Sequence, residues 1–145
     1  MNQQFPAPNP RKESTARLVE SMPVAALLGI TVEQVDDGTC VLSMPCSTAL
    51  TSDGSTVQGG IVATLADFAA VSAASTLMPP GWFLMTTGVE THHLAPARGA
   101  RLIAVGRSIK SGGRTAVAAA DVYLDSADGT LCLTARFSAA GIPPR

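Results

Sequence analysis

The sequence predicts an α+β domain in which an antiparallel sheet curls around one long buried helix. The helix is expected over residues 58–76, where Asp67 is the only formally charged residue between Asp53 and Glu90. A helix that is apolar on every side is a buried helix. Two short strand candidates precede it and a meander of four follows. One flat sheet face cannot cover such a helix, so we expect the sheet to curl and a second copy of the chain to complete the cover.

Size and composition restrict the class of protein. A chain of 145 residues with 46% hydrophobic and 14% charged residues is expected to form one folded domain rather than a disordered one. A net charge of -1 gives no electrostatic footprint for nucleic acid. We find no membrane-span pattern and no secretory signal. The three cysteines lack metal-ligand spacing and are typical of reduced thiols, so we expect a cytoplasmic protein.

The N-terminal part divides into a tail and a helix. The Pro- and Asn-rich residues 1–10 predict a flexible tail, and residues 11–145 a single domain. A helix is expected over 11–22, where apolar side chains recur on one side and Pro23 ends the pattern. The short apolar turn that follows closes at Gly29, a residue type that favours a helix C-cap.

Turn residues separate the predicted strands. Asp36-Asp37-Gly38 predicts a hairpin between the first two, and Met78-Pro79-Pro80-Gly81 ends the long helix. The small side chains of the alanine run 116–120 would let a helix or a second sheet approach closely. The strands are expected at residues 30–35, 39–45, 83–94, 101–110, 114–124 and 130–139.

The entrance of the long helix carries a motif. Gln58-Gly59-Gly60 precedes Asp67, which stands nine positions after Gln58. This pattern resembles the hotdog-fold thioesterases, specifically the branch related to the phenylacetate-degradation (PaaI-like) thioesterases. The resemblance covers roughly residues 24–140 and implies the hotdog fold with a short N-terminal helix. Further matching segments are Leu65-Ala66-Asp67, Thr86 to Pro96, Ser111-Gly112-Gly113-Arg114 and Asp128-Gly129.

The resemblance implies hydrolysis of an aryl-acyl or medium-length acyl-CoA by a homodimer or homotetramer, with active sites between two subunits. Asp67 would be the general base or the nucleophile, and the residues leave both roles open. The Gly59 backbone N–H would stabilise the oxyanion. In this family the acid and the glycine come from opposite subunits. Coenzyme A enters only as part of the substrate, and no metal or redox cofactor is implied.

The resemblance also assigns supporting roles. Ser52 stands where relatives place Asn or Gln, and its hydroxyl has a shorter reach. Thr86 would be a hydroxyl partner in the site, with Thr87 as a close rival. The turn after the second meander strand offers backbone N–H groups beside a cation, which suits the phosphates of coenzyme A. The expected substrate contacts are Gln58, Gly60, Thr87, Ser111, Gly112, Gly113 and Arg114.

Several residues have a purely structural interpretation as well. Asp67 could be satisfied by a local donor such as Thr64, and the two glycines could serve close helix packing. Ser55-Thr56-Val57-Gln58 resembles a capping box that would start the helix earlier. Neighbouring His92 and His93 point to opposite faces of a strand, which excludes a simple two-His metal site and suggests one packed and one exposed ring.

Two other functions remain as alternatives. Ser52 motivates a non-catalytic acyl-CoA binding protein with the same fold. A hotdog hydratase would need an acid paired to a histidine, and neither His92 nor His93 is placed for that. Gly59 and Asp67 are separated by about 12 Å along the helix at 1.5 Å per residue. We therefore expect each copy to carry two half-sites that a second subunit completes.

Overall fold

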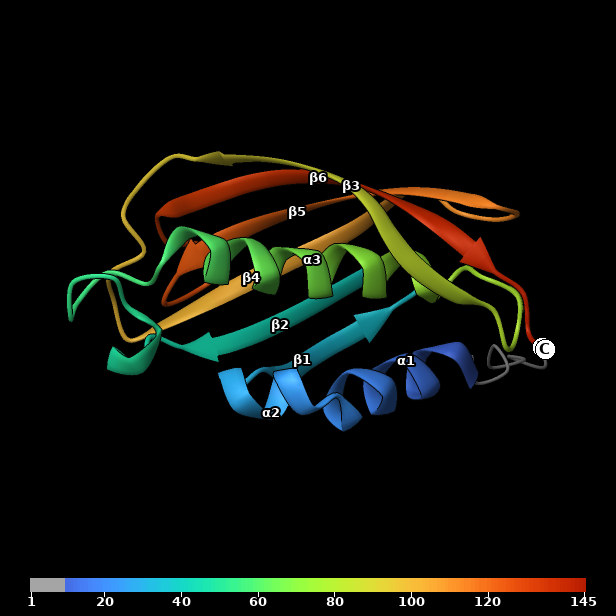
Figure 1. Cartoon of the computed structure of the whole chain (residues 1–145), viewed down its shortest axis with the longest axis horizontal. Helices are drawn as coiled ribbons and strands as arrows, with labels where there is room; N and C mark the ends of the chain where they lie inside the picture. Colours follow the sequence, from blue (N-terminus) through green and yellow to red (C-terminus); the bar gives the residue numbers. More distant parts are fainter. Residues whose placement is uncertain (1–9) are drawn as a thin grey trace, which may run out of the picture.

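The computed structural model describes residues 10–145 and contains every expected helix and strand. Most bounds agree with the sequence prediction within one residue, and the last strand runs three residues further. The predicted tail lies outside the described residues, except for Pro10, which begins the first helix. The elements in Figure 1 are α1 (Pro10–Ser21), α2 (Pro23–Leu28), β1 (Thr31–Asp36), β2 (Thr39–Pro45), the 3-10 turn η1 (Thr48–Leu50), α3 (Gly59–Ser75), β3 (Phe83–His93), β4 (Arg101–Lys110), β5 (Thr115–Leu124) and β6 (Leu131–Ile142).

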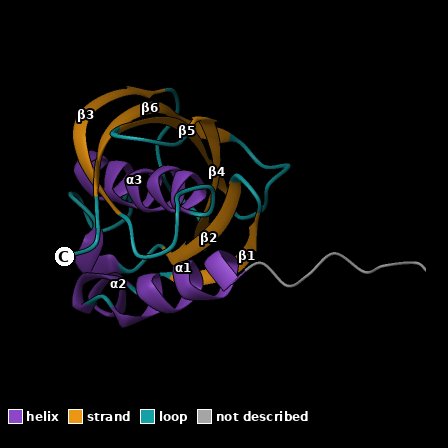
Figure 2. Cartoon of the chain, turned by 90° about the vertical axis from the view of Figure 1, so that its right-hand side faces the viewer, coloured by secondary structure: helices purple, strands orange, loops and turns teal. Residues whose placement is uncertain are grey.

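One antiparallel sheet holds all six strands, in the order β1-β2-β4-β5-β6-β3. The sheet curls around α3, and α1 and α2 lie on the side of α3 that the sheet leaves open (Figure 2). The predicted α+β hotdog fold is therefore confirmed. The strand that follows α3 in sequence lies at one edge of the sheet, beside the last strand of the chain, so β3 has one unpaired edge.

Small side chains let α3 lie against the sheet. A Cβ placed on Gly106 of β4 would come within 2.1 Å of the Ala69 carbonyl oxygen of α3, so only glycine fits there. Ala116, Ala118 and Ala120 of β5 are buried in the same core. This agrees with the close approach that the alanine run predicts.

The cover of α3 is incomplete within one chain. Its residues that face the sheet, such as Leu65, Ala69 and Ala73, are fully buried. A stripe on the opposite side is exposed or only partly buried, and it includes Gly60, Ala63, Thr64, Asp67 and Val71. The spacing of this stripe follows the helical repeat. A single chain therefore leaves one side of its apolar central helix open over the first turns.

The predicted helix ends are largely as the sequence indicates. The side-chain oxygen of Gln58 accepts a hydrogen bond from the Ile61 N–H at 3.1 Å and caps α3. The capping-box interpretation is therefore wrong, because α3 begins at Gly59. Gly29 caps α2 with φ 72°, as predicted.

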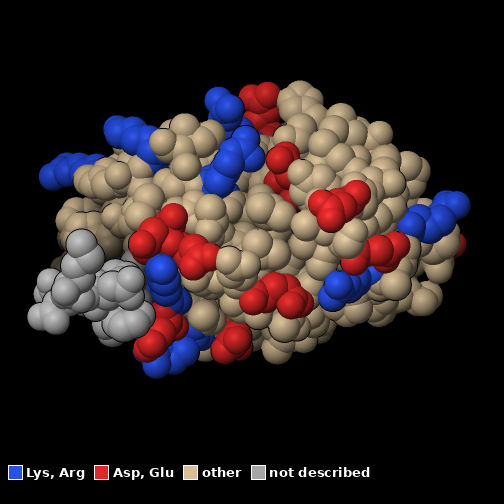
Figure 3. All heavy atoms as spheres, turned by 180° about the vertical axis from the view of Figure 1, so that it is seen from behind, with Lys and Arg blue, Asp and Glu red and all other residues tan. Residues whose placement is uncertain are grey.

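Surface charge, metal-ligating groups, helix length and the state of the cysteines describe the rest of the chain. On the face shown in Figure 3, acidic and basic side chains are interspersed. Among residues 10–145, no group of three or more His, Cys, Asp or Glu side chains could hold a metal ion. No helix in this part of the chain is long and apolar enough to span a membrane. All three cysteines are free thiols, and burial raises the pKa of Cys40 to about 12.

Candidate active site

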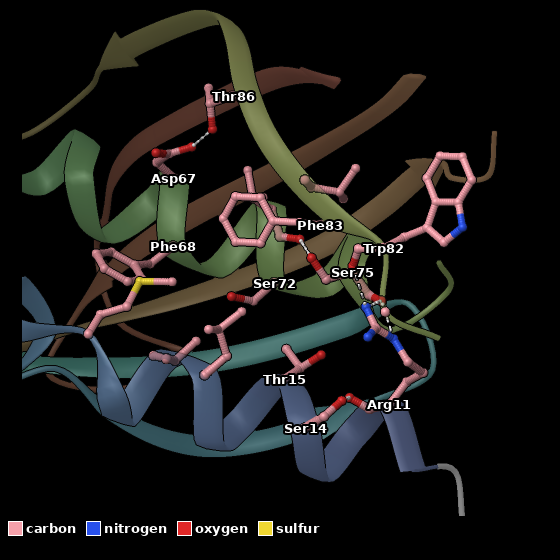
Figure 4. Close-up of a pocket in the computed structure, with 16 residues that line it drawn as sticks. Arg11, Ser14, Thr15, Asp67, Phe68, Ser72, Ser75, Trp82, Phe83 and Thr86 are labelled. Carbon is pink, nitrogen blue, oxygen red and sulfur yellow. Dashed lines mark hydrogen bonds between the residues drawn. The ribbon is translucent and has the colours of Figure 1, made fainter. Parts of the chain in front are cut away.

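Asp67 on α3 is held by a hydroxyl from β3. The Thr86 Oγ1 donates a hydrogen bond of 2.8 Å to Asp67 Oδ1 (Figure 4). The local donor suggested by the sequence is not used, because Thr64 donates instead to the Gly60 carbonyl at 2.9 Å. Thr86 is thus the threonine that reaches the acid. Its rival Thr87 is exposed and makes no hydrogen bond to Asp67.

Burial raises the pKa of Asp67 above its ordinary value, and the hydrogen bond from Thr86 opposes the shift. Burial acts in this direction because it penalises the charged form of a carboxyl group. A carboxylate with a raised pKa is a stronger base than an ordinary surface aspartate. Perturbed carboxyl groups of this kind concentrate at functional sites.

A bulge in β3 sets which side chains face α3. The pairing with β6 shifts between Thr86 and Gly88, which leaves Thr87 as the extra residue. Thr86 pairs with Ala139 and His93 pairs with Leu133, and both partners are buried on the inner face. Residues directly opposite on paired strands share a face. The bulge therefore aims both Thr86 and His93 inward, although an odd number of positions separates them in sequence.

Asp67 lies at one end of a cavity of about 410 Å³, which we name the α1 pocket. Figure 4 shows Asp67 and Thr86 at one end and Arg11 at the other. Arg11 donates 2.9 Å from Nη2 to the Ser75 carbonyl, which ties α1 to the end of α3. The cavity is mostly apolar, and it is lined by Arg11, Ser14, Thr15, Leu18, Val19, Met22, Asp67, Phe68, Val71, Ser72, Ser75, Gly81, Trp82, Phe83, Leu84 and Thr86.

The N-terminus of α3 opens into a second cavity of about 460 Å³, the Gly59 pocket. The first N–H groups of a helix have no partner inside the helix. No described residue accepts a hydrogen bond from the Gly59 N–H. A Cβ on Gly59 would stand 3.1 Å from His93 Cε1, so a side chain here would crowd the cavity. The lining residues are Ser52, Thr56, Val57, Gly59, Val62, His93, Leu94, Ala95, Pro96, Ala97 and Cys132.

Ser52 reaches the Gly59 pocket on a loop that Asp53 organises. Asp53 Oδ1 accepts hydrogen bonds from the N–H groups of Ser55 at 2.9 Å and Thr56 at 2.7 Å. These bonds lower the pKa of Asp53 to about 2. Arg98 donates to the Thr56 hydroxyl at 2.9 Å, which joins the loop to the segment after β3.

The structure thus divides these candidate residues among four places. Asp67 and Thr86 meet at the α1 pocket, whereas Ser52 and Gly59 meet at the Gly59 pocket. The amide of Gln58 is engaged in the helix cap, and a Cβ on Gly60 would meet that amide at 2.9 Å. The turn of Ser111, Gly112, Gly113 and Arg114 lies at the opposite end of α3, where the Ser111 hydroxyl donates to the Ala74 carbonyl at 2.8 Å.

The histidines were only partly predicted. His92 Nε2 and Glu90 Oε1 lie 2.9 Å apart and form an exposed pair on β3. The expectation of one packed and one exposed ring is wrong, since both histidines are exposed in the single chain. The ring of His93 stands beside Gly59, and strand alternation alone could not reveal this because the bulge changes the face.

The sequence did not lead us to predict that α1 lines the α1 pocket together with Asp67. A signal for this is present in the sequence, because Thr15, Leu18 and Val19 of α1 and Met22 directly after it recur at helical spacing on one side. Such a stripe predicts burial. It does not reveal that the helix covers a cavity rather than a packed core.

A curled antiparallel sheet around one central helix defines the hotdog fold (Figure 2). The family model of the thioesterase superfamily matches residues 54–138, more than half of the chain. The protein therefore belongs to the thioesterase superfamily and is a thioester hydrolase. Comparison with curated protein sequences gives no match.

Solved structures agree with this assignment. A thioesterase family protein from Silicibacter pomeroyi is 27% identical, with a TM-score of 0.85 over 92% of this chain and 98% of that one. A mutant thioesterase from Pseudomonas aeruginosa is 26% identical, with a TM-score of 0.78 over 97% of each chain. The PaaI protein of the E. coli phenylacetic acid degradation operon is 20% identical, with a TM-score of 0.82 over 94% and 96%, and shows the likeness of fold.

Proposed function

We propose that the protein hydrolyses an aryl-acyl or medium-length acyl-CoA to the free acid and coenzyme A. The observation that carries the proposal is the desolvated Asp67, which Thr86 fixes at the end of the mostly apolar α1 pocket. An apolar cavity with a few convergent polar groups suits an acyl chain. The acid stands where the reacting end of that chain would lie.

In the proposed reaction, Asp67 takes a proton from a water molecule that attacks the thioester carbonyl, or attacks the carbonyl itself. The carbonyl oxygen becomes an oxyanion, and the Gly59 N–H of a second copy donates a hydrogen bond to it. The positive end of the α3 dipole favours the same negative charge. The carbon–sulfur bond then breaks, and coenzyme A leaves as the thiolate. Where Asp67 itself has attacked, a water molecule then hydrolyses the anhydride that it forms with the acyl group, which releases the free acid and restores the carboxylate. Ser52, which lines the Gly59 pocket together with Gly59, would orient the water or the thioester.

Three features support assembly as a homodimer or homotetramer. Gly59 and Asp67 line different cavities of one chain. The first turns of α3 are partly open on the side away from the sheet. Val89 and Leu94, at or next to the unpaired edge strand β3, are each 55% exposed. A second copy placed there would cover these residues and bring its own half-sites to this chain.

The assembly would also determine how coenzyme A is held. We propose Gln58, Gly60 and Thr87 as contacts near the thioester. The turn from Ser111 to Arg114 lies at the far end of α3, so it would contact the phosphates of a substrate bound mainly by other subunits. The free thiols are compatible with a cytoplasmic location.

A panel of acyl-CoAs tests the proposal. Release of the coenzyme A thiol is measured for straight-chain acyl-CoAs of increasing length and for aryl-acyl-CoAs, with the melting temperature recorded alongside. We expect turnover of at least one medium-length or aryl-acyl member. Thermal stabilisation without turnover of any member would contradict hydrolysis and favour the acyl-CoA binding protein, for which the shorter reach of Ser52 is the supporting observation.

A further inference from the structure

Arg11 places a positive charge at the far end of the mostly apolar α1 pocket. Figure 4 shows its guanidinium near Ser75, away from Asp67 and Thr86. The Nε and Nη2 atoms of Arg11 donate to the Ser75 carbonyl at 3.3 and 2.9 Å, and Nη2 also donates to the Trp82 carbonyl at 3.4 Å. Backbone atoms of two separate segments thus hold the guanidinium in one place.

The position of this charge follows from the end of α3. Ser75 is the last residue of that helix, where carbonyl groups lack partners inside the helix and a nearby cation is favourable. Swinging the side chain of Arg11 out of the cavity would give up its hydrogen bonds in a partly buried place. The guanidinium is therefore a fixed wall of the cavity rather than a mobile surface group.

A charged wall at the end of an apolar cavity limits how far an apolar chain gains by entering. Leu18, Phe68 and Val71 are among the apolar side chains that line the pocket. Along such walls, each further CH₂ group that is buried raises affinity about fourfold. A chain that reaches the guanidinium instead displaces water from a charged group and offers no hydrogen bond in return. The gain in affinity therefore stops at Arg11.

The distance from the acid to this wall corresponds to a chain of medium length. Ser75 follows Asp67 by eight residues, or about 12 Å along α3 at 1.5 Å per residue. Contact between the end of the chain and the guanidinium takes up about 4 Å of this, which leaves about 8 Å. An extended carbon chain advances about 1.2 Å per bond, because three bonds of an extended backbone span about 3.5 Å. About seven bonds therefore fit between Asp67 and Arg11, which corresponds to about eight carbons with the thioester carbonyl.

We propose that Arg11 is a specificity-determining residue that limits the acyl group to a length of about eight carbons. The apolar walls bind the carbon chain, and the guanidinium closes the far end of the site. A longer chain has to bend back or contact the charge, so it gains nothing over an octanoyl chain. This inference rests on the proposed acyl-CoA hydrolysis, since it places the thioester at Asp67.

The test uses a series of straight-chain substrates, namely hexanoyl-, octanoyl-, decanoyl- and dodecanoyl-CoA. For the unaltered protein we expect kcat/KM to rise about tenfold from hexanoyl- to octanoyl-CoA, as two further buried CH₂ groups allow, and to rise no further at decanoyl-CoA. Arg11→Met keeps a long side chain but removes the charge. In this variant decanoyl-CoA should become about tenfold better than octanoyl-CoA.

Two further variants separate the charge of Arg11 from its role in holding α1. Arg11→Lys keeps a cation at the end of the pocket, so it should keep the limit at octanoyl-CoA even where its melting temperature falls as much as that of Arg11→Met. Arg17→Met removes an exposed cation of α1 that does not line the cavity. It is the matched control and should leave the whole profile unchanged.

A kcat/KM that keeps rising to dodecanoyl-CoA in the unaltered protein would overturn the inference while acyl-CoA hydrolysis stands. A profile that Arg11→Met leaves unchanged, or that Arg11→Lys alters in the same way, would overturn it too. The rise in melting temperature that each acyl-CoA causes is measured in parallel and needs no turnover. A rise that stops increasing at octanoyl-CoA, without hydrolysis of any member, would contradict the proposed function and support the length limit.

Discussion

The two halves of α3 carry different kinds of candidate catalytic group, a backbone N–H in one and a side chain in the other. The first turn presents backbone: Gly59 offers an N–H without a partner, at the positive end of the helix, beside a polar loop. The second half presents side chains: Asp67 is desolvated at the end of an apolar cavity that α1 covers. In the proposed reaction, the first half would stabilise a developing negative charge, and the second half would accept a proton.

Under the proposed function, this difference would leave each chain with two incomplete sites. The two halves open into separate cavities, and neither cavity contains both the acid and the free glycine N–H. The helix keeps them apart because eight residues of rigid backbone span about 12 Å. Each half can therefore be altered without changing the other in the same chain, and the following predictions use this separation.

The largest effect is expected for Asp67→Asn. The amide keeps the size of the side chain but cannot accept the proton, so kcat should fall by about 10³-fold. The measurement is steady-state hydrolysis of the best acyl-CoA of the panel. Asp128→Asn, an exposed acid in the turn between β5 and β6, is the control and should retain normal turnover. Near-normal hydrolysis by the Asp67 variant would remove this residue from the mechanism.

A smaller loss is expected for Gly59→Ala, with kcat about 10²-fold lower, comparable to removal of one oxyanion donor. The added methyl group would lie 3.1 Å from His93 Cε1 and would obstruct the approach of the carbonyl oxygen to the N–H. The pH dependence of the remaining activity should stay unchanged, because Asp67 lies in the other cavity. An altered pH profile would show that the two halves are not independent.

Thr86→Val should have a moderate effect that depends on pH. The hydrogen bond from Thr86 lowers the pKa of Asp67, so its loss raises that pKa further. The acidic limb of the kcat/KM profile should move to higher pH, with about tenfold lower activity on that limb. Thr87→Val is the matched comparison and should shift the limb less, since Thr87 is the bulged residue. Equal shifts in both variants would contradict the assignment of Thr86.

The smallest effect concerns stability. Because the pKa of Asp67 is raised in the folded state, the folded protein binds this proton more tightly than the unfolded chain. The free energy of unfolding therefore falls as the pH rises from the ordinary carboxyl pKa through the folded value. Asp67→Asn should melt at a higher temperature than the unaltered protein at neutral pH, and the gap should close in acid. A gap that widens in acid would refute the raised pKa.

Local patterns were enough to predict most of the fold. The apolar run after Gln58, the breaker at Pro79 and the turn at Gly38 predicted their elements because each acts through nearby backbone. The alanine run 116–120 predicted the close approach of a helix or a second sheet, and α3 is the element that packs there. The single acid in the buried helix also pointed to Asp67, since an isolated charge there has a high cost.

The remaining features of the site depend on contacts between distant segments. Thr86 faces Asp67, and His93 faces Gly59, because of a bulge whose position no residue pattern shows. Thr15 of α1 and Ser72 of α3 line one cavity although they lie far apart in the sequence. Sequence patterns predict which residues are buried, but they do not predict which distant residues face the same cavity.

Mixing of subunits tests most directly whether the acid and the glycine act from different copies. Asp67→Asn and Gly59→Ala chains, each nearly inactive alone, are co-expressed with different tags and the mixed dimers are isolated. A mixed dimer should contain one unaltered site and one doubly altered site, so it should recover about half of the activity of the unaltered dimer, as two-fold symmetry requires. Mixed dimers as inactive as either parent would contradict the account.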